Sequence, residues 1–275
     1  MNGSTSALSW RRRRLDPDRP RGLRSSLAAV AALTALPFAG LTTLVVATGS
    51  SLHAVDERIT DAAHAYALDN PGWVRAMSLW TDVFAPNPLR LAALLLVVWL
   101  LHRNARRTAG WVAVTMVVGG TLGPLLKLLV TRDRPDLLDP VSSAPGYAFP
   151  SGHALNAALA AGVLLVVFLP GTRGRPWRRA ALWVAAVALA GVTGFSRIAL
   201  GVHWTSDVVA GLLLGAAVVT ATLAAFALWR DGDGRHPGDR PQPGDGQQPG
   251  DGQQPGDRPQ QGDRQQPGAE STATG

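Results

Sequence analysis

The chain has 275 residues, of which 47% are hydrophobic and 16% charged; it has no cysteine, and its formal net charge is +7. Soluble globular domains carry about 25% charged residues, so this composition argues against a soluble protein. The lack of cysteine excludes disulfide scaffolds, cysteine nucleophiles and thiolate metal sites. No recognition module accompanies the positive charge, so we expect no nucleic-acid partner.

Residues 1–24 form a basic N-terminal segment with seven arginines. A basic cluster just before an apolar run is typical of an N-terminus held on the cytoplasmic side. The run that follows, 27–47, is longer than the about 7 to 15 apolar residues of a signal peptide, so we expect an uncleaved anchor. We expect residues 25–229 to form one membrane domain.

Six apolar segments are each expected to cross the membrane as an α-helix. In chain order they are 27–47, 84–101, 109–130, 154–169, 180–195 and 208–228. At 1.5 Å per residue, the 21 residues of the first or the sixth segment cover a hydrocarbon core of about 30 Å. The predicted fold class is therefore all-α integral membrane with six transmembrane helices.

The arginines are distributed unevenly between the two sides of this topology. With the N-terminus inside, the cytoplasmic segments up to the last helix contain fourteen arginines and the outer segments five. An excess of basic residues on the cytoplasmic side is the usual pattern in membrane proteins. Both termini are therefore expected in the cytoplasm, at a cell membrane that the chain crosses several times.

Segment 49–88 is long for a loop and contains an amphipathic stretch, which we expect to lie along the outer membrane surface. His53, Asp61 and His64 are potential metal ligands there, but they lack ligand spacing. A solvated helix face is the favoured interpretation, and no metal is expected. Arg90, in the second apolar segment, is expected to snorkel to the membrane interface.

Residues 230–275 are mostly Gly, Pro, Gln, Asp and Arg, with the hexapeptide PGDGQQ repeated from Pro243. Almost no apolar side chain is available for burial, so we expect a disordered cytoplasmic tail.

Cationic residues gather at the predicted outer ends of the helices. Lys127, the only lysine of the chain, lies within an apolar segment, where an ionisable residue is a functional hypothesis by default. Arg134 follows this segment and Arg197 ends the fifth. Ser151 and Gly152 open the fourth, where free backbone N–H groups favour an anion. These residues together predict a phosphate-binding site.

Two histidines and an aspartate complete this set. His203 and Asp207 are four residues apart, so on one helical turn the carboxylate can hold the imidazole in the tautomer whose other nitrogen is free. This spacing predicts an activated histidine nucleophile, and leaves His153 to protonate the leaving oxygen and then to activate water. The predicted chemistry is phosphoryl transfer without a metal or another cofactor.

These residues resemble the motifs of the type 2 phosphatidic acid phosphatase superfamily, which also includes vanadium haloperoxidases and bacterial acid phosphatases. The motifs are Lys127-x6-Arg134-Pro135, Pro150-Ser151-Gly152-His153 and Ser196-Arg197-x5-His203-x3-Asp207. Every fixed position is filled, and the resemblance covers about residues 109–228.

The resemblance implies a six-helix membrane phosphatase with its site at the extracytoplasmic face. It implies a phosphohistidine on His203, with His153 as acid and then base, and Asp207 as the residue that orients His203. The phosphate cradle would consist of the three cations and the two helix-opening residues named above. The haloperoxidase branch is disfavoured because its members are soluble.

The expected substrate is a lipid phosphate or pyrophosphate, with an isoprenoid pyrophosphate such as undecaprenyl pyrophosphate favoured on the family's bacterial roles. The alternatives are phosphatidic acid and phosphatidylglycerol phosphate. A transporter or flippase using His153 and His203 as a proton relay is an alternative from another class, but polar groups of transporters normally lie near the membrane midplane. A scaffold whose working part is the tail is a third hypothesis.

The sequence leaves the oligomeric state open. Two glycine pairs have the small-xxx-small spacing that lets membrane helices approach closely, Gly119 with Gly123 and Gly211 with Gly215. We interpret both pairs as internal helix packing rather than dimerisation.

Overall fold

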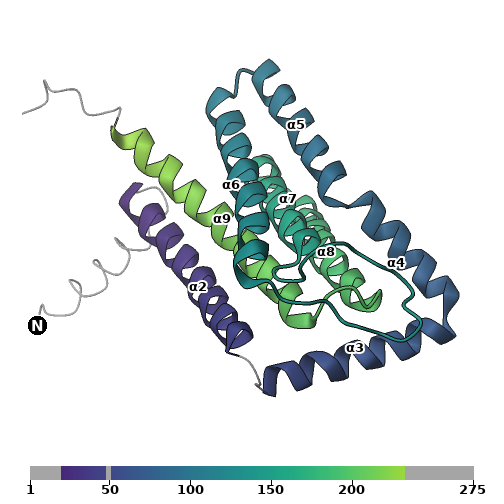
Figure 1. Ribbon diagram of the computed structural model, residues 1–275. Helices are drawn as coiled ribbons and strands as arrows, with labels where there is room; N and C mark the ends of the chain where they lie inside the picture. Colours follow the sequence, from purple (N-terminus) through teal and green to yellow (C-terminus); the bar gives the residue numbers. More distant parts are fainter. Residues whose placement is uncertain (1–19, 48–50, 233–275) are drawn as a thin grey trace, which may run out of the picture. The chain divides into compact units, whose positions relative to one another are not determined.

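The computed structural model describes residues 20–47 and 51–232, which form α-helices and one short 3-10 helix (Figure 1). The α-helices are α2 (Pro20–Val46), α3 (Ser51–Asp69), α4 (Pro71–Val83), α5 (Pro86–His102), α6 (Arg106–Val130), α7 (Gly152–Phe168), α8 (Pro176–Ala199) and α9 (Thr205–Gly232). The 3-10 helix η1 (Leu169–Thr172) follows α7. The basic residues 1–19 and the repeat tail from residue 233 lie outside the described residues, so the disorder of the tail stays a prediction.

Six helical segments of the described chain are long and apolar enough to cross a membrane. They are Ala28–Val46, Pro71–His102, Arg106–Val130, Gly152–Thr172, Pro176–Ala199 and Thr205–Ala227. This number and the all-helical architecture confirm the predicted fold class.

The second of these segments begins earlier than expected. α4 and α5 together extend over Pro71–His102, a segment of 32 residues. At 1.5 Å per residue its length is about 48 Å, which exceeds the hydrocarbon core of about 30 Å. The expected span, 84–101, corresponds to α5, and the prediction did not include the preceding helix α4. Arg75 and Asp82 interrupt the apolar pattern of α4, and Pro71 starts its helix.

Arg90 of α5 is exposed and contacts a neighbouring helix. Its Nε donates a hydrogen bond to Oδ1 of Asn156 on α7, at 3.1 Å. Its snorkelling to the membrane interface stays a prediction.

α3 lies across the ends of the other helices (Figure 1) and contacts α2, α4, α8 and α9. Its buried residues share one face at helical spacing: Asp56, Thr60, His64 and Ala67. The segment is thus an amphipathic helix as predicted, and its place on the outer membrane surface stays a prediction.

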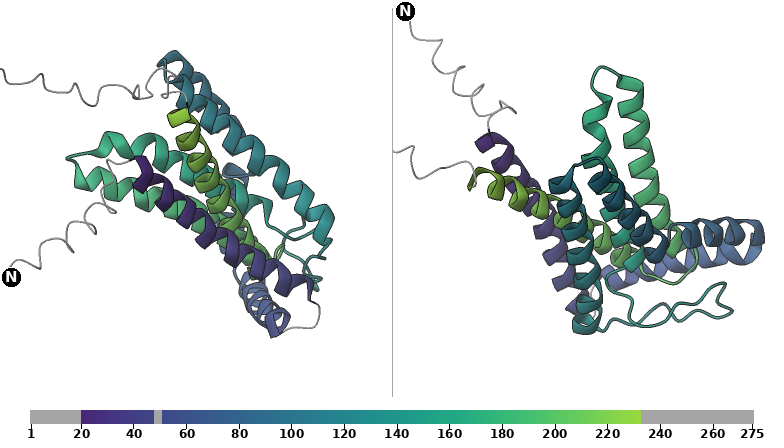
Figure 2. Two further views of the ribbon diagram at one scale, coloured as in Figure 1. Left: turned by 90° about the vertical axis from the view of Figure 1, so that its left-hand side faces the viewer. Right: turned by 90° about the horizontal axis from the view of Figure 1, so that it is seen from above.

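The remaining helices pack into the core that positions the motifs. α7 contacts α6, α8 and α9, and it runs beside α8 as a helical hairpin (Figure 2). The largest cluster of buried apolar residues lies between α5, α6, α7 and α9 and includes Leu100, Trp111, Val112, Leu155, Leu159 and Val218.

Glycines allow α7 to approach α9 and α6 closely. A Cβ on Gly211 would lie 2.6 Å from the carbonyl oxygen of Ser151, and one on Gly215 would lie 2.6 Å from Cβ of Ala158. Two glycines of α6 face leucine side chains of α7 in the same way: Gly119 and Gly123. Internal packing by both glycine pairs is therefore confirmed.

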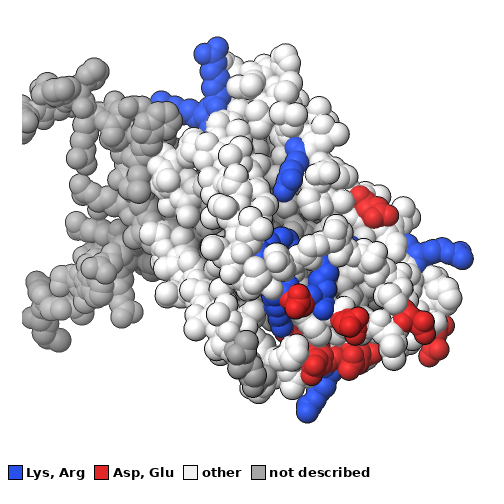
Figure 3. All heavy atoms as spheres, in the orientation of Figure 1, with Lys and Arg blue, Asp and Glu red and all other residues white. Residues whose placement is uncertain are grey.

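Charged side chains gather toward the two ends of the face shown in Figure 3. Most of the acidic ones lie toward the end that α3 crosses, and the surface between the ends is mostly uncharged apart from single charged groups. A mostly uncharged band between charged ends is typical of a protein that spans a bilayer.

Candidate active site

The three motifs meet at the end of the helices that α3 crosses. α6 and α8 end there, at Val130 and Ala199, and α7 and α9 begin there, at Gly152 and Thr205. Because consecutive spans run in opposite directions, two C-termini and two N-termini share this end (Figures 1 and 2). Residues that are up to 80 positions apart in the sequence, from Lys127 to Asp207, are thereby brought together.

The first motif follows the end of α6. Lys127 lies in the last turn, and its Nζ donates a hydrogen bond to the carbonyl oxygen of Tyr147. Arg134 donates from Nε to the carbonyl oxygen of Gly146 at 2.8 Å and from Nη1 to that of Val202 at 2.5 Å. Its Nη2 also contacts the carbonyl oxygens of Pro145 and Tyr147, at 3.1 and 3.3 Å. Arg134 thus ties the loop before α7 to the loop before α9.

The second motif starts α7. Ser151 is the N-cap residue, and its backbone N–H donates to the carbonyl oxygen of Asp207 at 3.0 Å. Its Oγ is buried and has no hydrogen-bond partner among the described residues. The next residue is Gly152, and a Cβ built on it would have no neighbour within 4 Å. The start of this 17-residue helix therefore offers open space, a free hydroxyl and backbone N–H groups to an anion.

Arg197, in the last turn of α8, comes from the third motif. It is only 6% exposed, and its Nη1 donates to Oγ1 of Thr81 on α4 at 3.0 Å. Its Nε is buried without a partner in the described part of the chain. A buried guanidinium with an unused donor is suited to bind a phosphate oxygen.

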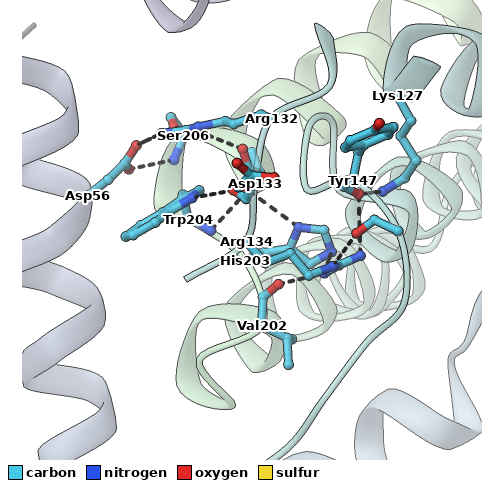
Figure 4. A network of polar contacts seen from close by, with 12 residues as sticks. Asp56, Lys127, Arg132, Asp133, Arg134, Tyr147, Val202, His203, Trp204 and Ser206 are labelled. Carbon is cyan, nitrogen blue, oxygen red and sulfur yellow. Dashed lines mark hydrogen bonds and ion pairs between the residues drawn. The ribbon is translucent and has the colours of Figure 1, made fainter. Parts of the chain in front are cut away.

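His203 lies just before α9 (Figure 4), and Asp207 lies in the first turn of that helix. The two residues are 2% and 0% exposed. The imidazole Nδ1 is 3.4 Å from Oδ2 of Asp207, and its Nε2 is 3.1 Å from Nη1 of Arg134. Arginine only donates, so this contact requires an unprotonated Nε2 and a proton on Nδ1. This is the tautomer that leaves Nε2 with a free electron pair.

Burial and neighbouring cations favour the neutral form of this histidine. Burial lowers the pKa of His203 well below its usual range, and the positive charges of Arg134, Lys127 and Arg197 lower it further. A neutral imidazole at neutral pH is the form that acts as a nucleophile.

His153, the second residue of α7, is half-buried. It lies within electrostatic reach of Arg197, His203, Arg134 and Lys127. The structure thus gathers all eight predicted site residues at one end of the bundle, although their roles stay predictions.

The structure adds two residues that the sequence analysis missed. Arg132 holds Asp207 through Nη1 at 2.7 Å and Asp56 of α3 through Nη2 at 2.8 Å. Arg132 stands two residues before Arg134 in the same motif, and this position in the sequence indicated that Arg132 lies near the site. For Asp56 the sequence gives one indication of burial, its helical spacing to Thr60. An isolated acidic residue is usually solvated, so this indication was weak.

Segment 49–88 was predicted to expose its three potential metal ligands on a solvated helix face. This prediction is correct for two of them and wrong for the third. His53 and Asp61 are exposed, whereas His64 is 8% exposed and its Nε2 is 2.7 Å from the carbonyl oxygen of Leu138. The spacing of His64 from Asp56 and Thr60 puts it on the buried face of α3. In the described residues no group of three or more His, Asp or Glu side chains is placed as a metal site.

The arrangement is chemically suited to act on a phosphate group. It combines a buried histidine, fixed cations, a helix N-terminus and a second histidine that can carry a proton.

Residues 108–231 match the PAP2 superfamily. The chain is 30% identical over 123 residues to an undecaprenyl-diphosphatase from Sulfolobus acidocaldarius, a match that covers 42% of this chain and 54% of that protein. It is 33% identical over 103 residues to phosphatidylglycerophosphatase B from Bacillus subtilis, a match that covers 36% of this chain and 50% of that protein. The chain thus spans about half the length of these curated relatives.

The fold is similar to a crystal structure of a transmembrane PAP2 type phosphatidylglycerolphosphate phosphatase from Bacillus subtilis. The TM-score is 0.60 and the identity is 26%, with 70% of this chain and 94% of that chain covered.

Proposed function

We propose that the chain, whose residues 108–231 match the PAP2 superfamily, is a membrane phosphatase acting on a lipid phosphate or pyrophosphate. The observation that carries this proposal is the buried His203, with its Nε2 beside Arg134 and within electrostatic reach of Lys127 and Arg197.

The charge of the site supports a phosphate ligand. Four cations, Lys127, Arg132, Arg134 and Arg197, accompany three carboxylates, Asp56, Asp82 and Asp207, so positive charge is in excess. Buried charges without partners are costly, and a phosphate anion would offset this excess. The unpartnered Oγ of Ser151 and Nε of Arg197 would then each gain an acceptor.

The proposed reaction has two steps. Nε2 of His203 attacks phosphorus and forms an N–P bond, while the bond from phosphorus to the leaving oxygen breaks and His153 gives that oxygen a proton. Water then attacks the phosphohistidine, His153 accepts its proton, and inorganic phosphate leaves with the N–P bond broken. Asp207 supports the Nδ1 proton of His203 throughout, and the cations stabilise the charge on the equatorial oxygens.

Two features support a lipid substrate. The site lies at the ends of membrane-spanning helices, where lipid phosphates lie. An apolar cavity of about 970 Å³ lies between α7, α8 and α9, and its lining includes Ala158, Leu212 and Gly191. Ala158 and Leu212 are five residues beyond His153 and Asp207 on the same helices. A cavity of this lining suits a hydrocarbon chain whose phosphate reaches the site.

The favoured substrate is an isoprenoid pyrophosphate such as undecaprenyl pyrophosphate. The support is the similarity to the Sulfolobus acidocaldarius protein named undecaprenyl-diphosphatase. Phosphatidylglycerol phosphate is the second candidate, favoured by the structural similarity to the Bacillus subtilis phosphatase, and phosphatidic acid is a further alternative.

We place the site on the extracytoplasmic side and both termini in the cytoplasm. The distribution of arginines supports this orientation, since segments 102–107 and 170–179, which join α5 to α6 and α7 to α8, contain seven arginines. The site lies at the opposite ends of these helices.

The experiment is release of inorganic phosphate by the detergent-purified chain from undecaprenyl pyrophosphate, phosphatidylglycerol phosphate and phosphatidic acid. We expect release from all three, with the highest kcat/KM on the isoprenoid pyrophosphate. A higher kcat/KM on phosphatidylglycerol phosphate would make that lipid the favoured substrate in place of the isoprenoid pyrophosphate. No release by folded protein would contradict the phosphatase and favour a transporter, which moves its substrate intact.

Two further arms separate the remaining alternatives. EDTA is expected to leave the rate unchanged, and inhibition that Mg²⁺ reverses would contradict the metal-free mechanism. Deletion of residues 230–275 is expected to preserve the rate, whereas a scaffold that works through its tail would lose its function.

A further inference from the structure

We propose that Asp56, on α3, is a positioning residue for the hydrolytic reaction: through Arg132 and Ser206 it fixes Asp207, and thereby the imidazole of His203. This assignment rests on the proposed function. It gives α3, which lies outside the three motifs, a part in the chemistry.

Asp56 is buried, and both oxygens of its carboxylate accept hydrogen bonds. The residue is 1% exposed, and its Oδ1 accepts a hydrogen bond from the backbone N–H of Ser206 at 2.9 Å. Its Oδ2 accepts from Oγ of Ser206 at 2.5 Å and from Nη2 of Arg132 at 2.8 Å (Figure 4). A single carboxylate of α3 thus binds both the first turn of α9 and the loop after α6.

Arg132 connects this carboxylate to the site. Its Nη1 donates to Oδ1 of Asp207 at 2.7 Å and contacts Oγ of Ser206 at 2.6 Å. The guanidinium also lies 5.5 Å from the ring centroid of Trp204, which restricts its plane. One rigid fork is therefore shared between two carboxylates, one on α3 and one on α9.

The position of Asp207 depends on this shared fork. Oδ2 of Asp207 accepts the backbone N–H of Trp204 at 3.0 Å and lies 3.4 Å from Nδ1 of His203. The contact to the histidine is the longest of these, so a small shift of the carboxylate breaks it. Without the charge of Asp56, the fork of Arg132 is free to bind Asp207 with both nitrogens and to draw it away from the imidazole.

The attachment of α3 does not depend on Asp56 alone. His64 contacts the carbonyl oxygen of Leu138 at 2.7 Å, and Thr60 and Ala67 are buried on the same face. α3 also contacts four other helices. A buried carboxylate bound to an arginine is costly to desolvate, so its position between Ser206 and Arg132 is better explained by the orientation of Asp207 than by packing.

The test is Asp56→Asn in the full-length detergent-purified chain, with Asp61→Asn as the matched control. Asp61 is on the same helix but exposed, so its substitution makes the same change of charge without touching the network. We expect Asp56→Asn to lower kcat by about 10- to 100-fold, since misplacing a reacting group by about 1 Å costs about 100-fold. KM should stay within about twofold, and Asp61→Asn should match the wild type.

The pH profile separates positioning from a merely structural role. The charged and titratable groups that act on His203 come from five parts of the chain: Lys127, Arg134, His153, Arg197 and Asp207. Loss of Asp56 removes negative charge and weakens the bond from Asp207 to His203, and both changes disfavour the imidazolium. The acid limb of kcat/KM should therefore move to lower pH. A merely structural role would lower the fraction of folded enzyme and leave the midpoint unchanged.

Ser206→Ala keeps the test decisive if Asp56→Asn does not fold. This variant removes the Oγ that bridges Asp56 and Arg132 but keeps the backbone N–H contact, so it should lower kcat less and shift the acid limb in the same direction. Unchanged kcat and pH profile in folded protein would overturn the proposal. If the wild type itself releases no phosphate beside a His203→Ala control, the proposed function fails instead.

Discussion

The motif-bearing helices α6–α9 and the preceding helices α2–α5 differ in how they are packed and in what they contribute. None of the residues in the most apolar window of α2 is buried, against half of those in α9. The first group carries the three motifs, and close glycine contacts hold its helices together. The second group carries none of the motifs.

The preceding helices nevertheless contact polar residues of the motif-bearing group at single points. Asp56 of α3 binds Arg132, and Thr81 of α4 binds Arg197. Trp80 of α4 and Arg90 of α5 donate to two further polar side chains of this group, Thr193 and Asn156. The difference teaches that the chemistry lies in one half of the molecule, while its alignment depends on isolated residues of the other half.

After the loss of His203 itself, the largest effect is expected within the motif-bearing group, for His153→Ala. Loss of a general acid and base should lower kcat by about 10²- to 10⁴-fold on a lipid monophosphate. The loss should be smaller on a pyrophosphate, whose leaving phosphate needs no proton. The ratio of the two rates measures this difference, and equal losses on both substrates would contradict the acid role.

The second-largest loss of activity in this series is expected when a methyl group is added at the start of α7. Gly152→Ala should keep the melting temperature of the protein, because the new Cβ has no neighbour within 4 Å. It should lower kcat/KM by about 100-fold if the phosphate occupies that space. The matched control is Gly171→Ala in η1, which also has no neighbour within 4 Å and lies at the other end of α7. Unaltered kcat/KM in Gly152→Ala would remove the helix start from the phosphate cradle.

The third prediction tests the contribution of α4. Thr81→Val removes the acceptor for Nη1 of Arg197, and hydrogen bonds to charged groups contribute about 1.5 to 3 kcal/mol, so kcat/KM should fall by about tenfold or more. Thr121→Val is the matched control, since this exposed hydroxyl bonds only to carbonyl oxygens of its own helix, α6. If Thr81→Val and Thr121→Val have the same kcat/KM, the preceding helices do not align this cation.

The smallest expected effect concerns pH: the acid limb of kcat/KM should be displaced from the usual pKa of histidine. Burial and the neighbouring cations keep the pKa of His203 well below its usual range, so the acid limb of kcat/KM should have its midpoint below pH 6.5. The unfolded chain binds a proton at this residue near pH 6.5 and the folded chain does not. Stability should therefore fall as pH decreases from about 6.5 toward the lower pKa. A midpoint at or above 6.5 would contradict a buried neutral nucleophile.

The motif-bearing half could be predicted from the sequence because its signals are local. Lys127, Ser151 and His203 each stand in a short motif, and their helices appear as uninterrupted apolar runs. Alternating helix directions are sufficient to bring these motifs to one end.

The other half could not be predicted in the same way. α4 contains Arg75 and Asp82, which interrupt its apolar pattern, so the sequence did not predict a helix from Pro71 ahead of the apolar run in α5. Nothing in the local sequence distinguishes the inward-facing Asp56 from the exposed Asp61 on the same helix. Their difference follows from how α3 lies against α9, which is a property of tertiary packing.

The most direct measurement is capture of the phosphoenzyme from a lipid pyrophosphate labelled with ³²P in its terminal phosphate. We predict acid-labile label on the wild type and none on His203→Ala that is folded by its melting curve, together with a loss of phosphate release of at least about 10⁴-fold. Label or phosphate release that persists in folded His203→Ala would contradict the account.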